Sequence, residues 1–94
     1  MDNKTRKYLK TLAMHIKPMV QIGKFGITDG TLKTLEELLT AHELVKVRLL
    51  QNSSLSRKDV ARKLAETTNA EIIQEIGRQV VFFRRNHKKP KIQW

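Results

Sequence analysis

Apolar residues recur along the chain with two spacings, which together predict three helices and four strands. Helical spacing, at intervals of three and four residues, occurs in three segments. The residues on the inner helix faces are Leu9, Leu12, Ala13 and Ile16, then Leu32, Leu35 and Leu39, then Val60, Ala61, Leu64 and Ala65. The expected N-caps are Asp2 or Asn3, Thr28 or Asp29, and Ser56. Pro18 is expected to end the first helix.

Alternation of apolar and polar residues predicts the strands. The four segments are PMVQI at 18–22, HELVKVRLL at 42–50, AEIIQEI at 70–76 and QVVFFRR at 79–85. Val20 and Ile22 point the same way in the first of them. In the second, apolar residues alternate with Lys46 and Arg48, which is the pattern of a strand buried on one side only. The last two strands read as an antiparallel hairpin with a tight turn at Gly77–Arg78.

The order of these elements, α-β-α-β-α-β-β, predicts an α/β fold with a mixed four-stranded sheet. Each β-α-β step should be a right-handed crossover between parallel strands, and the hairpin adds an antiparallel strand. We therefore expect an open-faced two-layer sandwich, with the two crossover helices on one face and the other face partly exposed. Residues 1–94 are expected to form a single domain, with a basic and mobile tail at 86–94.

The charge balance indicates what kind of partner to look for. Nineteen lysines and arginines against nine aspartates and glutamates give a formal net charge of +10. Such an excess in a small domain is self-repulsive and is most often tolerated where a polyanion neutralises it. Nucleic acid is therefore the leading partner. An anionic membrane surface and simple solubility are the alternatives.

Several protein classes are excluded by what the chain lacks. There is no cysteine, so disulfides, thiolate zinc sites and cysteine nucleophiles are ruled out. No apolar run approaches the roughly 20 residues that span a bilayer. The N-terminal stretch MDNKTRKYLKTLAM is too charged for a signal peptide. We expect a cytoplasmic protein.

Positive charge is concentrated in particular segments. On a helical wheel Arg6, Lys10 and Lys17 lie along one flank of the first helix, and Lys7 lies just beyond them. The second and third helices instead interleave acids with bases, as is typical of local pairing on an exposed face. The basic segments are the first helix, the loop at 23–26, the outward side of the strand at 42–50, and residues 84–91. A solvated lysine face is the alternative interpretation of the first helix.

The stretch QIGKFGIT at 21–28 holds the most specific motif, in which Gly23 and Gly26 bracket Lys24 and Phe25. A mononucleotide P-loop or a dinucleotide fingerprint would need further residues that are absent. What fits is a G-x-x-G clamp on a sugar–phosphate backbone, the device that KH-type modules use on single-stranded RNA. The alternative is that the glycines only make the turn. Phe25 either stacks on a base or packs on the domain.

Three motifs in order, LAMHIKPMVQIGKFGITDGTL, HELVKVRLL and IGRQVVFFRR, resemble the CRM domain (chloroplast RNA splicing and ribosome maturation), and most closely its stand-alone bacterial YhbY-like members. The resemblance implies a fold similar to the C-terminal domain of translation initiation factor three. It also implies RNA binding and association with precursors of the large ribosomal subunit. The family's RNA-contacting G-x-x-G loop maps onto residues 23–26. Its basic surface maps onto Lys10, Lys17 and the arginines that end the last strand.

We therefore expect a non-enzymatic, monomeric protein that binds ribosomal RNA and assists maturation of the large subunit. The predicted RNA-binding residues are Gly23, Lys24, Phe25, Gly26, Arg6, Lys7, Lys10, Lys17, Arg84 and Arg85. The three histidines have no metal-ligand spacing, and no catalytic constellation, cofactor site or small-molecule substrate is indicated. Alternatives are a structural ribosomal protein or a general RNA-binding protein. A small nuclease is a further alternative, and it would need carboxylates within the basic groove.

Overall fold

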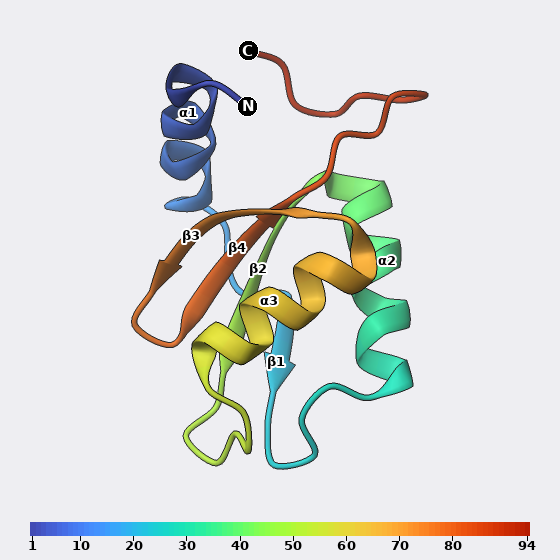
Figure 1. Ribbon diagram of the computed structural model, residues 1–94. Helices are drawn as coiled ribbons and strands as arrows, with labels where there is room; N and C mark the ends of the chain where they lie inside the picture. The colour runs from blue at the N-terminus through green and yellow to red at the C-terminus, as the bar shows by residue number, and fades with distance from the viewer.

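The computed structural model describes all 94 residues and contains three helices and four strands in the predicted order (Figure 1). The elements are α1 (Asn3–Ala13), β1 (Val20–Ile22), α2 (Asp29–His42), β2 (Leu44–Leu49), α3 (Arg57–Thr68), β3 (Glu71–Ile76) and β4 (Gln79–Phe83). The α/β class and the mixed four-stranded sheet are confirmed.

Each helix begins at a capping residue that the sequence predicted. The Asp2 side chain accepts a hydrogen bond from the Thr5 amide at 2.7 Å. Thr28 and Ser56 cap α2 and α3 in the same way, each accepting the amide three residues on. Such caps satisfy amides that have no partner within the first helical turn.

The end of α1 differs from the prediction, because the helix stops at Ala13 and not at Pro18. The amides of Met14 and His15 bond to carbonyls three residues back, so the chain tightens into a turn. A proline ring clashes with the carbonyl four residues earlier, which here belongs to Met14. Lys17 consequently lies in the connection to β1, and it does not extend the basic flank of the helix.

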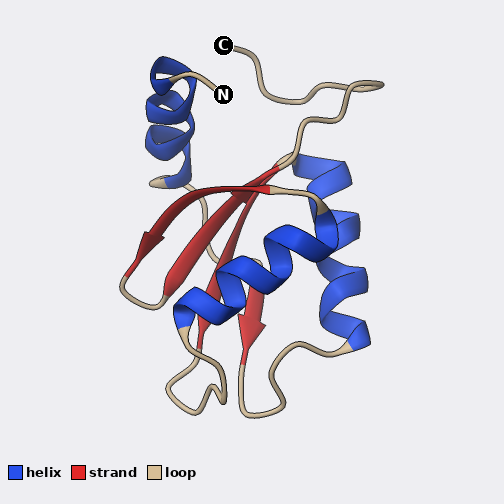
Figure 2. Cartoon of the chain, in the orientation of Figure 1, coloured by secondary structure: helices blue, strands red, loops and turns tan.

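The strand order is β1-β2-β4-β3, with β1 parallel to β2 and the other pairs antiparallel. The carboxyl ends of β1 and β2 therefore lie at one end of the sheet, beside the connections at 23–28 and 50–56. We call this the loop end, where the two connections run next to each other (Figure 2). Because β4 is antiparallel to β2, its carboxyl end lies at the opposite end of the sheet. We call this second end, with residues 43 and 84–94, the tail end.

Two hydrophobic cores cover the two faces of the sheet. The larger lies beneath α2 and α3 and includes Ile22, Leu39, Val47 and Phe82. The smaller lies on the other face, where α1 packs over it; its buried residues are Leu9, Ala13, Leu44, Ile73, Val81 and Phe83. The two crossover helices thus share one face, as predicted. The other face is covered by α1 toward the tail end and is exposed toward the loop end.

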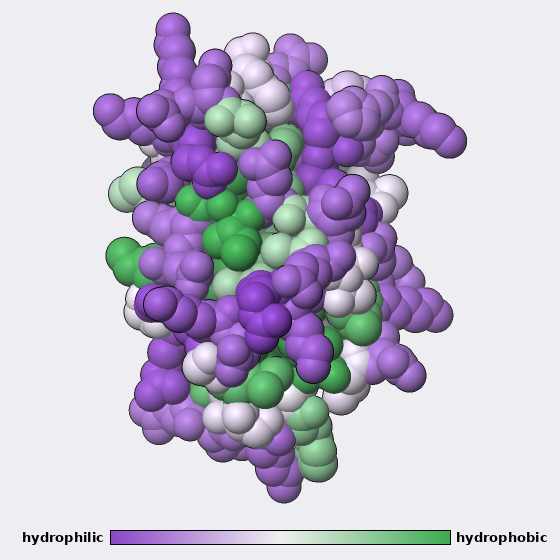
Figure 3. All heavy atoms as spheres, viewed as in Figure 1, coloured by the Kyte–Doolittle hydropathy of each residue, from purple (hydrophilic) through white to green (hydrophobic).

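Hydrophilic side chains dominate the outline of the molecule when it is viewed from the side of α3 (Figure 3). Hydrophobic atoms are visible between them in small groups. None of the helices combines the length and the apolar character that crossing a bilayer requires.

Candidate nucleic-acid interface

The glycine loop forms a tight turn at the loop end, closed by a 3.1 Å hydrogen bond from the Gly26 amide to the Gly23 carbonyl. Gly26 has φ of 66°, a left-handed conformation in which side chains are strained. The amides of Lys24 and Phe25 have no hydrogen-bond partner in the protein. These two donors are therefore free to bind an anion.

Phe25 lies at the tip of this turn and does not pack on the domain. Its side chain is 80% exposed, and the Lys24 ammonium lies 5.0 Å from its ring centroid. Phe25 is the most exposed of the large hydrophobic residues in the chain. The structure therefore does not support packing of Phe25 on the domain, and stacking on a base stays a prediction.

The N-terminus of α2 follows the turn and takes up part of the local hydrogen-bonding capacity. Thr28 accepts the Thr31 amide at 3.1 Å, so this donor is not available to a ligand. Asp29 is exposed in the first helical turn and adds a negative charge there. The donors that face outward at this end are consequently those of the turn itself.

The cations of α1 differ in whether they are already paired. Lys7 and Lys10 are exposed and take part in no ion pair. Arg6 instead donates to the Ile72 carbonyl at 2.7 Å and lies 3.5 Å from the Glu71 carboxylate. Arg6 thus fastens α1 to β3, whereas the two lysines are free.

Arg84 is committed to contacts inside the protein. It lies 2.8 Å from the Glu36 carboxylate and donates to the Thr68 carbonyl at 2.9 Å and to the Thr40 hydroxyl at 3.1 Å. These contacts link the end of β4 to both α2 and α3. A guanidinium group used in this way has little donor capacity left for a phosphate.

Arg85 is engaged with the tail of the chain. Its guanidinium donates to the Ile92 carbonyl, lies 3.4 Å from the Glu43 carboxylate and sits 4.3 Å from the Trp94 ring centroid. Arg84 and Arg85 also lie at the tail end, since they follow β4, while the glycine loop lies at the loop end. The structure therefore does not bring these predicted site residues together.

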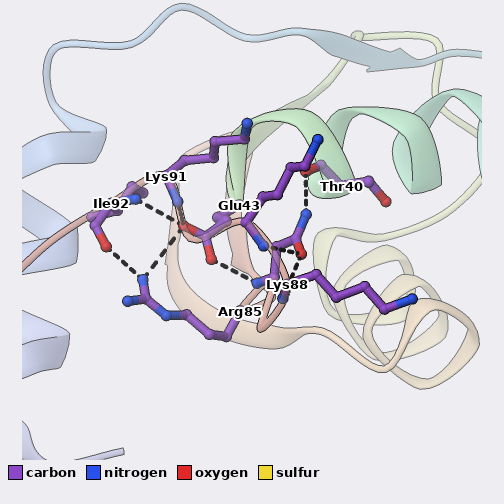
Figure 4. Close-up of polar contacts among 8 residues, drawn as sticks. Thr40, Glu43, Arg85, Lys88, Lys91 and Ile92 are labelled. Carbon is purple, nitrogen blue, oxygen red and sulfur yellow. Dashed lines mark hydrogen bonds and ion pairs between the residues drawn. The ribbon is translucent and has the colours of Figure 1, made fainter.

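Glu43 is a residue whose importance the sequence did not reveal. It is fully buried, has φ of 65°, and accepts hydrogen bonds from the amides of Asn86, Lys91 and Ile92 at 2.6, 2.7 and 2.8 Å (Figure 4). Burial alone raises the pKa of this carboxyl, but the three amides and the Arg85 charge outweigh it and lower the pKa below its ordinary value. The sequence pattern placed Glu43 within the strand segment at 42–50, whereas the structure places it between α2 and β2.

Arginines and lysines have different roles across the whole molecule. All five ion pairs use arginines, and none of the twelve lysines takes part in one. The two arginines outside these pairs, Arg48 and Arg78, both lie toward the loop end, on β2 and in the β3–β4 turn. The positive charge available to a polyanion thus comes from the lysines and from these two arginines. No three histidine or acidic side chains gather in a metal-binding cluster.

Comparison with known proteins places the chain in a family. The CRS1 / YhbY (CRM) domain matches residues 1–84. A Bacillus subtilis protein named "Probable RNA-binding protein YqeI" is 32% identical, covering 99% of this chain and 97% of its own. A Haemophilus influenzae protein named "RNA-binding protein" is also 32% identical, covering 99% of this chain and 93% of its own. The solution structure of SAV1595 from Staphylococcus aureus matches with a TM-score of 0.80 at 36% identity, covering 99% of this chain and 97% of that one. The chain therefore belongs to the CRM-domain family.

Proposed function

We propose that this protein is a non-enzymatic RNA-binding protein whose residues 1–94 act as one domain. Its ligand is ribosomal RNA, and its role is to assist maturation of the large ribosomal subunit. Membership of the CRM-domain family and the names of the relatives from Bacillus and Haemophilus support RNA as the ligand class. The net charge of +10 supports a polyanionic ligand independently.

The observation that carries this proposal is the exposed turn with two unpartnered amides. A phosphate oxygen binds the amides of Lys24 and Phe25, and the Lys24 ammonium adds a point charge. The Phe25 ring stacks on a neighbouring base. Free backbone donors, a cation and an exposed aromatic within four residues are the components that a single-stranded RNA site needs.

The remaining predicted residues divide into two groups in this proposal. Lys7, Lys10 and Lys17 are exposed, and their ammonium groups attract and neutralise phosphates of the RNA. Three arginines do not contact RNA in this proposal, because their guanidinium donors are used inside the protein; they are Arg6, Arg84 and Arg85. We assign them to holding α1, the helices and the tail in place.

The test reverses the charge at Lys24 and strains the turn at Gly26, which has positive φ. Lys24→Glu combined with Gly26→Asp should weaken RNA binding at least about tenfold in gel-shift assays at fixed salt. Lys24→Glu alone should also reduce the slope of log affinity against log salt, by about 0.7 for each lost phosphate contact. Circular dichroism of each variant establishes that it is folded.

The matched control is Lys63→Glu, which makes the same charge change on the exposed surface of α3. It should weaken binding far less than Lys24→Glu. Equal losses in the two variants would show that only net charge matters, and would remove the glycine loop from the site.

A structural ribosomal protein shares the size and the charge of this chain. Such a protein would stay in mature subunits, whereas a maturation factor should occur only with precursors. Fractionation of a cell lysate on a sucrose gradient separates the two roles. Co-migration with mature subunits would contradict the maturation role and leave RNA binding intact.

A further inference from the structure

Four strands contribute one side chain each to a row that crosses the sheet near its loop end. The row, from one edge of the sheet to the other, is Gln21, Arg48, Gln79 and Ile76. The neighbouring residues Ile22, Val47 and Val80 belong to the core beneath α2 and α3. Because side chains alternate along strands, the row points to the opposite face. We call this row, with the adjoining Lys46 and Gln74, the open face.

A hollow lies between the open face and the end of α1. Its volume is about 390 Å³, and Met14 and Ile76 contribute apolar side chains to its lining, while Lys46, Gln74 and Gln79 contribute polar ones. This size falls at the lower end of the range of small-ligand sites, about 300–1,000 Å³. A planar base is a ligand of suitable dimensions.

Two large apolar side chains at this hollow are left exposed. Met14 is 75% exposed and Ile76 is 58% exposed. Neither belongs to the buried core clusters, although both lie next to well-packed elements. Exposed apolar groups that share one hollow, rimmed by polar residues, mark a binding surface.

The charge of the open face is uniformly positive. Lys46 and Arg48 are both without an ion-pair partner and alternate along β2. No carboxylate belongs to the row or to the adjoining pair. Glu71, the acid on this side of β3, lies at the tail end and is paired with Arg6. This charge complements a nucleic acid.

The glutamines add hydrogen-bonding groups that the protein does not use. The side chains of Gln21, Gln74 and Gln79 form no hydrogen bond among those in the structure, and they come from three different strands. A carboxamide carries both donors and an acceptor, as the edges of nucleobases do. Three free amides beside an apolar hollow therefore fit a base better than they fit a simple phosphate.

We propose that the open face binds unpaired nucleobases of single-stranded RNA. A base lies against Met14 and Ile76, the carboxamides of Gln74 and Gln79 bond to its edge, and Lys46 and Arg48 bind the flanking phosphates. Thioether sulfur makes favourable contacts with aromatic rings, so Met14 suits this role. The inference rests on the proposed function and extends it, because Gln21 lies two residues before Gly23 and connects the open face to the glycine loop.

Methionine methyl resonances give a direct test. The chain has three methionines, so ¹³C-methyl labelling gives three reporters. Addition of a short oligoadenylate should shift the Met14 methyl upfield through the ring current of a stacked base. An abasic ribose–phosphate oligomer of the same length should not do so, and Met1 should not respond to either. An unmoved Met14 methyl, or equal shifts with both oligomers, would overturn the inference.

Affinity measurements separate this site from the glycine loop. Met14→Ser with Ile76→Ser should lower the affinity for oligoadenylate about fivefold to tenfold and leave that for the abasic oligomer unchanged. Lys24→Glu should lower both affinities together. If Met14→Ser with Ile76→Ser loses affinity and Lys24→Glu does not, the RNA-binding role of the glycine loop is refuted and that of the open face stands. If only Lys24→Glu loses affinity, the role of the open face alone is refuted.

The control for the apolar change is Tyr8→Ser, which removes an exposed ring from α1 outside the hollow. It should leave the preference for base-bearing RNA unchanged. If wild-type protein binds base-bearing and abasic oligomers equally, the inference is wrong.

Discussion

Glu43 connects three segments of the chain through a single buried carboxylate. It ends α2, precedes β2 and accepts the amides of Asn86, Lys91 and Ile92. The positive φ of Glu43 costs a residue with a side chain about 1 kcal/mol or more. The hydrogen bonds to the carboxylate offset this cost, because a hydrogen bond to a charged group still contributes about 1.5–3 kcal/mol after the water contacts of the unfolded chain are subtracted.

Glu43 should make stability depend on pH in the acid range. Hydrogen bonds lower its folded-state pKa below the ordinary 4.5, so its contribution is full above that pH and is lost as pH falls through the folded pKa. Glu43→Gln should lower the free energy of unfolding at neutral pH by about 2–4 kcal/mol and flatten its acid dependence. Urea unfolding at several pH values measures both effects.

The control is Glu37→Gln, an exposed position on α2, which should change the free energy of unfolding by less than about 0.5 kcal/mol. The Asp2 pKa is also lowered, chiefly by the hydrogen bond from the Thr5 amide, but Asp2 is exposed and should contribute little. An unchanged acid dependence in Glu43→Gln would contradict the role given to this carboxylate.

The two loop glycines should respond differently to substitution. Gly26 has positive φ, and a Cβ there would lie 3.4 Å from side-chain atoms of Leu55 and Ser54, so Gly26→Ala should cost about 1 kcal/mol of stability. A Cβ at Gly23 meets nothing closer than 3.5 Å, so Gly23→Ala should be nearly neutral for folding.

RNA affinity then decides whether Gly23 only makes the turn. If Gly23 permits close approach of a phosphate, Gly23→Ala should weaken RNA binding several-fold while the urea midpoint stays constant. Unchanged affinity in gel-shift assays would favour the turn-only interpretation for this glycine.

At the scale of elements, the tail is held by more contacts than its composition indicates. Three of its amides bond to Glu43, and the Trp94 ring lies edge-on to Phe83 with centroids 5.7 Å apart. The mobility expected for residues 86–94 stays a prediction, and these contacts favour an anchored tail.

Hydrogen exchange tests the anchoring directly. The amides of Lys91 and Ile92 should exchange more slowly than that of His87, which has no partner. The difference should disappear in Glu43→Gln. Equally fast exchange of all three amides in the wild-type protein would instead establish a mobile tail.

Element type and order were predictable because helix and strand spacings are local properties. Capping residues such as Thr28 and Ser56 act within four residues, and so could be read directly. The contacts of Arg84 could not be predicted from the sequence. Its partner Glu36 lies 48 positions away, and only the packing of α2 against the sheet brings the two side chains together. For the same reason the charge pattern did not separate free lysines from committed arginines.

The geometry of the candidate site was predictable to a similar extent. The glycine loop was located from four consecutive residues, and its exposure follows from its place between β1 and α2. Its separation from Arg85 depends on β4 being antiparallel to β2. The open face depends on register across four strands, which no local pattern specifies.

At the scale of the whole molecule, unpaired lysines make the free protein self-repulsive. Adding salt should therefore stabilise it, raising the free energy of unfolding by roughly 1 kcal/mol between low and physiological salt. The same salt should weaken RNA binding, because releasing condensed counterions into a more concentrated salt solution gains less entropy. Thermal unfolding and gel-shift assays in matched buffers should give these opposite trends. Parallel trends would contradict a charge-driven interface.

The first and last residues emerge together at the tail end, next to α1 (Figure 1). An affinity tag or biosensor attachment at either terminus would thus lie at the opposite end of the sheet from the glycine turn. Protein immobilised in this way presents Phe25 toward solution, so surface-based kinetic measurements with RNA oligomers should be free of steric interference from the support.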